Sequence, residues 1–155
     1  MQSLDTQQPL FAKHLGIKVC EWDNGRIVLE TKVKPEFCNN SGLPHGGFIT
    51  TLIDMATGLA GTYCPIPNHI RRALTLSLNI NFIGQSHNKT LKTVGKVTNS
   101  GWKVYFATGK VYDTAGVLLA SGQAVYRYRS GSETLEGQPL DNEENPQMVQ
   151  GVKGR

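Results

Sequence analysis

One carboxylate, Asp54, stands alone in the stretch between Glu36 and Asp113, where every other residue is neutral or basic. It falls in the middle of a mostly apolar segment, residues 46–63, whose hydrophobic pattern predicts a single helix. A carboxylate can serve as a general base or as a nucleophile. Because so apolar a helix leaves little surface to water, we favour a catalytic role over that of a solvated helix residue.

The predicted helix begins at His45-Gly46-Gly47. The first turn of a helix presents unpaired amides and the positive end of the helix dipole, which can stabilise a developing oxyanion. Glycine at this position lets a carbonyl group approach the N–H without a Cβ in the way. We therefore interpret Gly46 as the oxyanion donor and Gly47 as a further contact to substrate.

The two sides of the helix differ in character. Large apolar residues gather on the side opposite Asp54, which we expect to pack on a sheet, whereas the Asp54 side carries small and hydroxylic residues that leave room for another backbone or a ligand. The first set is Ile49, Leu52, Ala56, Leu59, Ala60 and Tyr63, and the second is Gly47, Thr50, Thr51, Thr57, Gly58 and Gly61.

Gly46 and Asp54 are eight residues apart, which separates their Cα atoms by about 12 Å along a helix. An aspartate side chain cannot span that distance to a carbonyl held at its own helix N-terminus. The sequence therefore predicts two antiparallel copies of the helix in a homodimer, each giving its N-terminal amide to the partner's Asp54. The stripe of small residues would be the surface along which they meet.

Hydrophobic periodicity predicts the other elements. Turn-forming residues fill 34–45, and period-two alternation is clearest at 74–82. One long helix with a meandering antiparallel sheet is an α+β arrangement in which the sheet must wrap the helix. The predicted helix at the start covers 8–15, and the predicted strands cover 17–22, 26–33, 72–82, 91–98, 102–112 and 117–128.

Length and composition indicate one domain over residues 1–130 and a polar tail, 131–155, that we expect to be disordered. No long apolar run or export signal is present, so a soluble, cytoplasmic protein is expected. The three cysteines are widely spaced and predict neither disulfides nor a metal site. The 14 Lys and Arg of residues 1–130 exceed 7 Asp and Glu, and their scattering favours a phosphorylated small molecule over nucleic acid.

The chain resembles hotdog-fold acyl-CoA thioesterases of the PaaI-like, phenylacetate-degradation type. The resemblance covers residues 10–128 and is most specific in the spacing of the loop motif before the helix and in an aspartate nine residues after its histidine. The matching residues are Asn39, Gly42, His45, Gly46, Gly47, Asp54, Thr75, Asn79, Ile80, Asn81, Phe82, Gly101, Asp113, Gly116 and Ala120.

This resemblance implies a hotdog fold and hydrolysis of an acyl-CoA thioester, without a cofactor, by a homotetramer built from two dimers. Asp54 would be the general base or nucleophile, Gly46 the oxyanion-hole amide, and His45 an orienting residue. Asn39 would contact the thioester carbonyl and Thr75 would position the water. We add Phe48, Phe82, Met55 and Lys103 as candidate contacts to substrate. The chain departs from the family at residues 84–89 and at Trp102.

Three alternatives remain at this stage. A hotdog dehydratase would be expected to place an acid beside a catalytic histidine, and no such pair is evident. A non-catalytic acyl-CoA sensor or carrier would not need Asp54, Asn39 and Gly46 together. A nucleophilic Cys38 has no histidine spaced to activate it.

Overall fold

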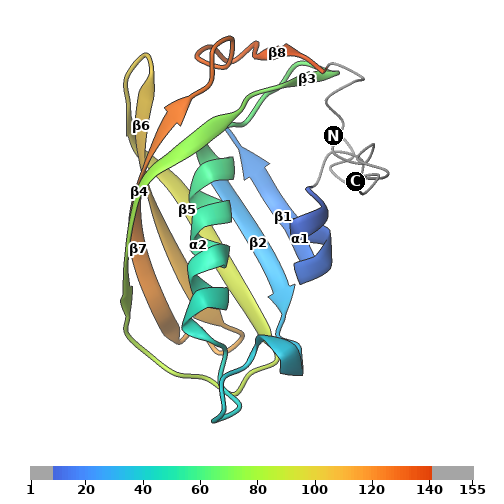
Figure 1. Ribbon diagram of the computed structural model, residues 1–155, viewed down its shortest axis with the longest axis vertical. Helices are drawn as coiled ribbons and strands as arrows, with labels where there is room; N and C mark the ends of the chain where they lie inside the picture. Colours follow the sequence, from blue (N-terminus) through green and yellow to red (C-terminus); the bar gives the residue numbers. More distant parts are fainter. Residues whose placement is uncertain (1–8, 141–155) are drawn as a thin grey trace, which may run out of the picture.

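The computed structural model describes residues 9–140 and contains one long helix and a six-stranded antiparallel sheet (Figure 1). The strand order is β1-β2-β5-β6-β7-β4, and two short strands, β3 and β8, pair separately. This is the predicted α+β arrangement. The elements are α1 (Leu10–Leu15), β1 (Ile17–Asp23), β2 (Arg26–Lys32), the 3-10 turn η2 (Pro35–Phe37), α2 (Gly46–Gly61), β3 (His69–Ile70), β4 (Ala73–Phe82), β5 (Thr90–Ser100), β6 (Val104–Asp113), β7 (Leu118–Tyr128) and β8 (Gln138–Pro139).

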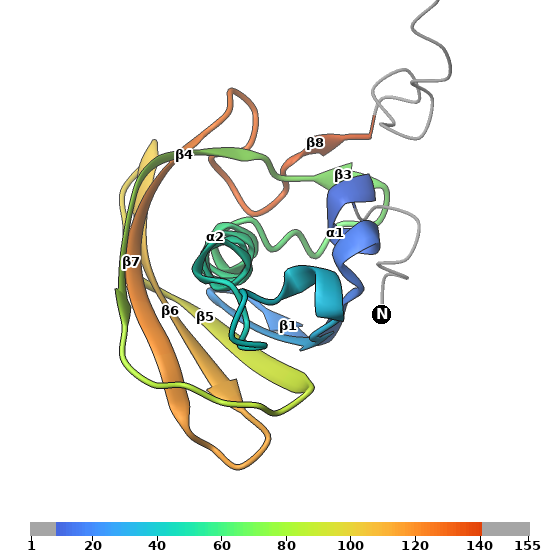
Figure 2. The ribbon, with the colours of Figure 1, turned by 60° about the horizontal axis from the view of Figure 1, so that its bottom comes forward.

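The sheet curls around α2. Seen from the end of the molecule, β4 and β7 lie on one side of the helix, while β6, β5 and β1 continue the curve beneath it (Figure 2). The helix is therefore enclosed on two sides by one continuous sheet, as the hotdog expectation requires. β4 ends the sheet, so one of its edges has no neighbouring strand within residues 9–140.

A row of glycines lets the helix approach the sheet closely. Gly95, Gly109 and Gly122 are direct cross-strand partners on the central strands β5, β6 and β7. A Cβ at Gly95 would lie 2.3 Å from the backbone oxygen of Ala56, and one at Gly109 would lie 2.8 Å from Cγ2 of Ile53. Since any larger residue would push α2 outward, this row sets the depth of the helix and the position of Asp54.

The buried side of α2 is rotated relative to the prediction. Ile49, Leu52, Ala56 and Ala60 are buried as expected. Leu59 lies at the margin of the core, where its carbonyl accepts a hydrogen bond from the Trp22 indole at 2.9 Å. Ile53, Thr57 and Gly61, closer to Asp54, are buried instead. The sheet therefore covers more of the helix surface than the apolar face of the helix predicted.

Tyrosines from the sheet fill the space beside the small residues of α2. Tyr105 and Tyr126 stack with their ring centroids 5.0 Å apart, and Tyr128 packs against Tyr105 at 4.8 Å. A Cβ added at Gly61 would lie 2.2 Å from the Tyr105 ring, and one at Gly58 would lie 3.4 Å from Tyr126. The C-terminal half of the small-residue stripe is thus closed by this chain's own side chains, which corrects its expected role as a surface between subunits.

The chain beyond β7 is ordered for longer than predicted. β8 pairs with β3, and the buried guanidinium of Arg71 donates hydrogen bonds to the carbonyls of Ser132 at 3.0 Å and Glu133 at 3.3 Å. Tyr128 lies under the same guanidinium, 4.7 Å from its ring centroid. The predicted tail therefore does not begin at residue 131, because Arg71 and β3 hold residues 131–140. Residues 141–155 lie outside the described part.

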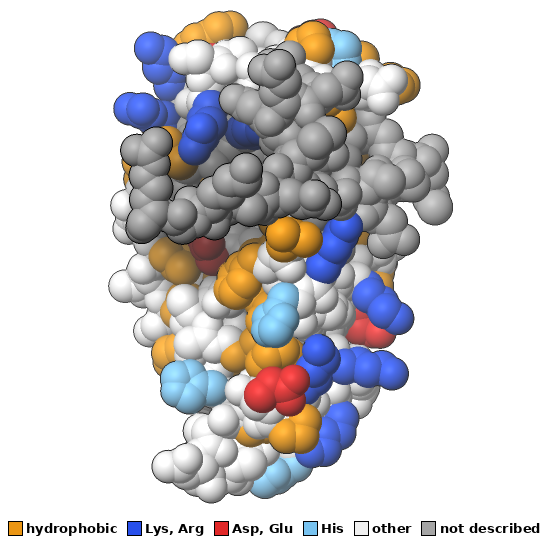
Figure 3. Space-filling view, turned by 45° about the vertical axis from the view of Figure 1, so that its right-hand side comes forward, with side chains coloured by type: hydrophobic (Ala, Val, Ile, Leu, Met, Phe, Trp, Pro, Cys, Tyr) orange, Lys and Arg blue, Asp and Glu red, His pale blue; other side chains and the backbone are white. Residues whose placement is uncertain are grey.

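On the face drawn in Figure 3, Lys and Arg side chains lie at the upper left and along the lower right, and those at the lower right stand beside acidic, histidine and hydrophobic side chains. Within the described residues, no helix is long and apolar enough to cross a membrane.

Candidate active site

Asp54 lies half-buried on α2, and two hydroxyl groups contact the same oxygen of its carboxylate. Thr75 Oγ1 donates to Oδ1 at 3.0 Å, and Tyr126 Oη donates to Oδ1 at 2.9 Å. No group of residues 9–140 donates to Oδ2. One carboxylate oxygen is therefore held by the protein, and the other is available for chemistry.

The sheet brings Thr75 and Tyr126 together. They are direct cross-strand partners on β4 and β7, so both side chains point from the same face of the sheet toward α2. The register of β4 shifts between Thr75 and Ser77, which places a bulge next to Thr75. Bulges commonly redirect side chains beside functional sites.

The Tyr126 hydroxyl also contacts two atoms of α2 other than the Asp54 carboxylate. It lies 2.7 Å from Asp54 O and 2.7 Å from Thr57 Oγ1. Burial, followed by the negative charge of Asp54, raises the pKa of Tyr126 above its ordinary value, although the hydrogen bond with Thr57 opposes that rise. The phenol therefore keeps its proton at neutral pH and can donate it to the carboxylate.

The N-terminus of α2 forms a second group of polar atoms. His45 is the N-cap residue, and its Nδ1 accepts a hydrogen bond from the Gly47 amide at 2.9 Å. Because Nδ1 accepts, it carries no proton, and the imidazole donates only through Nε2. The Gly46 amide finds no acceptor among the described residues and is free to bind an oxyanion. The orienting role predicted for His45 thus has a geometric basis in this cap.

Asn39 is fixed in the loop that leads into α2. Its Oδ1 accepts hydrogen bonds from the amides of Ser41 at 2.9 Å and Leu43 at 3.1 Å. These contacts determine the orientation of the side-chain amide, so Nδ2 is the end that remains available as a donor. Asn39 can therefore contribute a hydrogen bond to a carbonyl oxygen beside Gly46.

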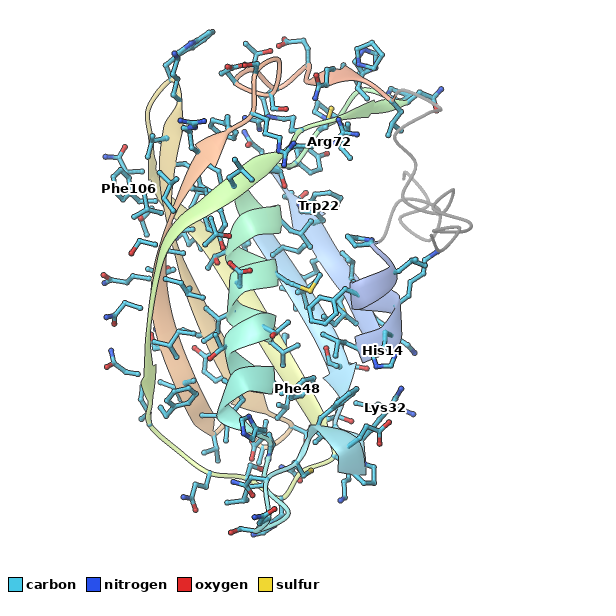
Figure 4. The ribbon with its side chains drawn as sticks, in the orientation of Figure 1. His14, Trp22, Lys32, Phe48, Arg72 and Phe106 are labelled. Carbon is cyan, nitrogen blue, oxygen red and sulfur yellow. The ribbon has the colours of Figure 1, made fainter. Side chains whose placement is uncertain are left out.

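The other predicted substrate contacts differ in their placement. The exposed Phe82 ring covers Gly46, where an added Cβ would lie 3.4 Å from Cζ. Phe48 lies near the start of α2 (Figure 4). It is buried and stacks on Phe37, with ring centroids 4.7 Å apart, so little of its ring remains for a substrate. Met55 is half-buried against the core.

Lys103 lies far from the Gly46 amide of the same chain. Its carbonyl accepts from the Tyr128 amide, and the Tyr128 hydroxyl donates to Gly61 O at the last residue of α2. Gly61 and Gly46 are the two ends of this 16-residue helix. Lys103 therefore sits at the end of the molecule opposite the proposed oxyanion hole.

The structure brings the site residues together in two groups. Asp54 and Thr75 form one group, and Asn39, His45 and Gly46 form the other. The helix is unbroken between Gly46 and Asp54, which gives an axial separation of about 12 Å. A single chain therefore does not bring its own carboxylate to its own amide donors.

Sequence reasoning missed Tyr126 and Thr57. The alternating pattern of residues 117–128 predicted a strand, but an inward-facing tyrosine on a strand is ordinarily a core residue. Only the cross-strand register with Thr75 shows that Tyr126 meets Asp54. Among the described residues, no group of three or more His, Cys, Asp or Glu side chains could hold a metal ion.

An antiparallel sheet curled around one helix, with a carboxylate in the helix and free amides at its start, defines the class as hotdog-fold. Solved structures agree on the fold. The Escherichia coli PaaI protein from the phenylacetic acid degradation operon is 19% identical, with a TM-score of 0.72 over 81% of this chain and 88% of that one. The thioesterase HI1161 from Haemophilus influenzae is 17% identical, with a TM-score of 0.72 over 83% and 92%.

A sequence relative establishes the family. The protein of Saccharolobus solfataricus named "Putative esterase SSO2140" is 33% identical over 108 residues, which cover 70% of this chain and 75% of that protein. No protein-family model matches the chain. The chain belongs to the family of this putative esterase, whose members with the hotdog fold are thioester hydrolases.

Proposed function

We propose that the protein hydrolyses acyl-CoA thioesters and that Asp54 is its catalytic carboxylate. The observation that carries this proposal is the arrangement at Asp54, where Thr75 and Tyr126 hold Oδ1 and leave Oδ2 free. The net positive charge of residues 1–130 suits a substrate that carries phosphates. Water and the thioester are the only reactants, so we expect no cofactor.

The free oxygen of Asp54 and the hydroxyl of Thr75 can hold the attacking water together. Thr75 Oγ1 donates its proton to Oδ1 and so offers only lone pairs to a water molecule. A water that donates one hydrogen bond to Thr75 and one to Oδ2 has its own lone pairs directed away from both, toward a carbonyl carbon. This sharpens the water-positioning role that the family resemblance implies for Thr75.

The reaction then follows the order of general-base catalysis. Oδ2 takes a proton from the water molecule while the water oxygen attacks the carbonyl carbon of the thioester. The Gly46 amide and Asn39 Nδ2 stabilise the oxyanion that results. The tetrahedral intermediate collapses with cleavage of the C–S bond. The proton on Asp54 passes to the departing thiolate, so the products are the free acid and CoA.

A homodimer would complete each site. A second copy whose α2 runs antiparallel would bring its Gly46 and Asn39 toward Asp54 of the first. The open edge of β4 carries exposed apolar side chains, Leu76 at 55% and Phe82 at 58% exposure, which supports a contact along this strand. We further expect two dimers to form a tetramer, which analytical ultracentrifugation would test.

Release of CoA thiol from a panel of short, long and aromatic acyl-CoA esters tests the proposed activity. Asp54→Ala should lower kcat by about 10²–10⁴-fold with little change in the melting temperature. Asp23→Ala, at an exposed position in a hairpin, is the matched control and should retain full activity. Near-normal turnover by Asp54→Ala on every substrate would remove this carboxylate from the mechanism. Tight binding of the esters by the wild type without thiol release would favour a carrier instead.

Single-turnover hydrolysis in ¹⁸O-water tests for a nucleophilic Asp54, because isotope in the enzyme can come only from an anhydride that water opens at the aspartyl carbon. A general base leaves the Asp54 carboxylate unlabelled and puts the isotope into the free acid. A nucleophilic Asp54 would form an acyl anhydride, and water attacking its aspartyl carbon would leave the isotope in the enzyme. Mass spectrometry of the peptide that contains Asp54 distinguishes these outcomes, provided that enzyme is in excess over substrate.

A further inference from the structure

Tyr126 stands apart from the other tyrosines of the stack. Each of the three donates a hydrogen bond to a backbone carbonyl of α2: Tyr126 to Asp54 O at 2.7 Å, Tyr105 to Gly58 O at 2.8 Å and Tyr128 to Gly61 O at 3.1 Å. These bonds attach the sheet to the helix. Only Tyr126 also contacts a carboxylate, that of Asp54, so its single proton is shared between Asp54 O at 2.7 Å and Oδ1 at 2.9 Å.

The protons of the neighbouring hydroxyls can be assigned from their contacts. An ionised carboxylate only accepts hydrogen bonds, so the Tyr126 proton must point toward Asp54. Thr57 Oγ1 lies 2.7 Å from Tyr126 Oη, and one of the two must supply the proton between them. Because the Tyr126 proton is used at Asp54, the single Thr57 proton serves both this contact and the carbonyl of Ile53, which also lies 2.7 Å from Thr57 Oγ1. Thr57 therefore holds the Tyr126 hydroxyl in place, and Tyr126 in turn contacts Asp54.

The contacts between Thr57 and Tyr126 are shielded from water. Thr57 is fully buried and Tyr126 is 2% exposed. Hydrogen bonds to an ionised group in such surroundings are stronger than those on a surface. The rings of Tyr105 and Tyr126 stack nearly parallel, with 13° between their planes, which fixes the direction of the phenol.

We propose that Tyr126 is a positioning residue for the reaction: by occupying Oδ1 together with Thr75, it makes Oδ2 the oxygen that acts on water. This inference rests on the proposed function of Asp54. Tyr126 itself touches neither water nor thioester. Its contribution is to hold the carboxylate in one rotamer before the substrate arrives.

Replacement of the hydroxyl tests this role with controls from the same stack. Tyr126→Phe should lower kcat about 10- to 100-fold, the loss expected for one hydrogen bond to a charged group, and should leave KM within about twofold. Thr57→Val should lower kcat by less.

Tyr105→Phe and Tyr128→Phe are the matched controls. Each loses one phenol hydroxyl that donates to a carbonyl of α2, so each should lower the melting temperature while leaving kcat unchanged. If Tyr126→Phe gave the same kcat as these two variants, Tyr126 would be only a structural residue and the proposal would be overturned.

A measurement that needs no turnover separates this proposal from the proposed function. The carboxyl ¹³C signal of Asp54, assigned by its absence in Asp54→Asn, should have a different chemical shift in Tyr126→Phe from that in the wild type and in Tyr128→Phe at the same pH. This difference without detectable hydrolysis of any acyl-CoA would support the contact and reject the proposed activity. Identical chemical shifts in the three proteins would reject the positioning role even if the enzyme is active.

Discussion

Thr75, on the open edge strand β4, donates its hydroxyl proton to Oδ1 of Asp54 in the middle of α2, across 3.0 Å. This hydrogen bond thus links a helix and a strand that are separate in the sequence. The contact depends on the glycine row, because Gly95, Gly109 and Gly122 set how deep the helix lies in the curl of the sheet.

Removal of this hydroxyl should reduce the rate more than the stability. Thr75→Val should lower kcat about tenfold, since the water loses one acceptor and Asp54 loses one donor. Because Thr75 is exposed, the melting temperature should change little. Thr51→Val is the control, since the Thr51 hydroxyl donates only to Gly47 O at 3.1 Å. An unchanged kcat for Thr75→Val would exclude Thr75 from water positioning.

Mixed dimers should reveal whether each site is shared between subunits. Asp54→Ala and Asn39→Ala should each be inactive alone. After mixing, unfolding and refolding together, hybrids of the two should regain about a quarter of wild-type activity, because half of the dimers are hybrids with one intact site of two. If Asp54 and Asn39 served the same site from one chain, no hybrid would contain an intact site and mixing would restore nothing.

The glycine row should be intolerant of a single methyl group. Gly95→Ala would bring Cβ to 2.3 Å from the backbone of Ala56, so α2 must move, at a cost of about 1–3 kcal/mol or more in the free energy of unfolding. Gly101→Ala is the control, since its Cβ would lie 3.6 Å from its nearest neighbour. Urea unfolding of both variants measures the difference. Equal midpoints would show that the helix depth is not set here.

Thr31 offers a substitution that should stabilise the fold. Its side chain is 1% exposed, and Oγ1 is the buried side-chain oxygen or nitrogen within residues 9–140 that has no hydrogen-bond partner. Thr31→Val removes this unsatisfied hydroxyl and keeps the shape of the side chain, which should add about 1 kcal/mol to the free energy of unfolding. Thermal unfolding measures the gain, and a lower melting temperature would contradict it.

Asp113 should make the stability depend on acid. Hydrogen bonds from Ser86, from the Val117 and Ala115 amides and from Asn88 outweigh the effect of burial and hold the pKa of this carboxyl below its ordinary value of 3.8. Its contribution to stability is therefore present above that value and is lost as the pH falls through the folded-state pKa. Asp113→Asn should lower the melting temperature at pH 7, and the difference from wild type should shrink toward pH 3. A difference that is constant over this range would contradict the assignment.

The sequence could predict the main elements because their signals are local. The alternation from Leu74 to Phe82 is visible without any partner strand, and the strand was found at residues 73–82. The apolar run after His45 likewise predicted the helix, which ends at Gly61, two residues before the predicted end. The loop polar atoms were also predictable, since Asn39 and His45 contact amides within four residues of themselves.

What could not be predicted depends on register and on long-range contacts. The ordering of residues 131–140 needs Arg71, 61 positions before Ser132, and no local pattern links the two. The rotation of the buried side of α2 depends on how far the sheet curls. Tyr126 falls in the same category, because a strand pattern fixes which side chains face inward and leaves open which helix residue they meet.

The bond from Trp22 to the carbonyl of Leu59 gives the protein an internal optical reporter. The indole is edge-on to Tyr63, with ring centroids 5.8 Å apart, while the other tryptophan, Trp102, is 67% exposed. Detachment of the C-terminal end of α2 would change the emission of Trp22 and leave that of Trp102 nearly constant. In a Trp102→Phe background, the intrinsic fluorescence would therefore follow the docking of the helix that carries Asp54, with no added label.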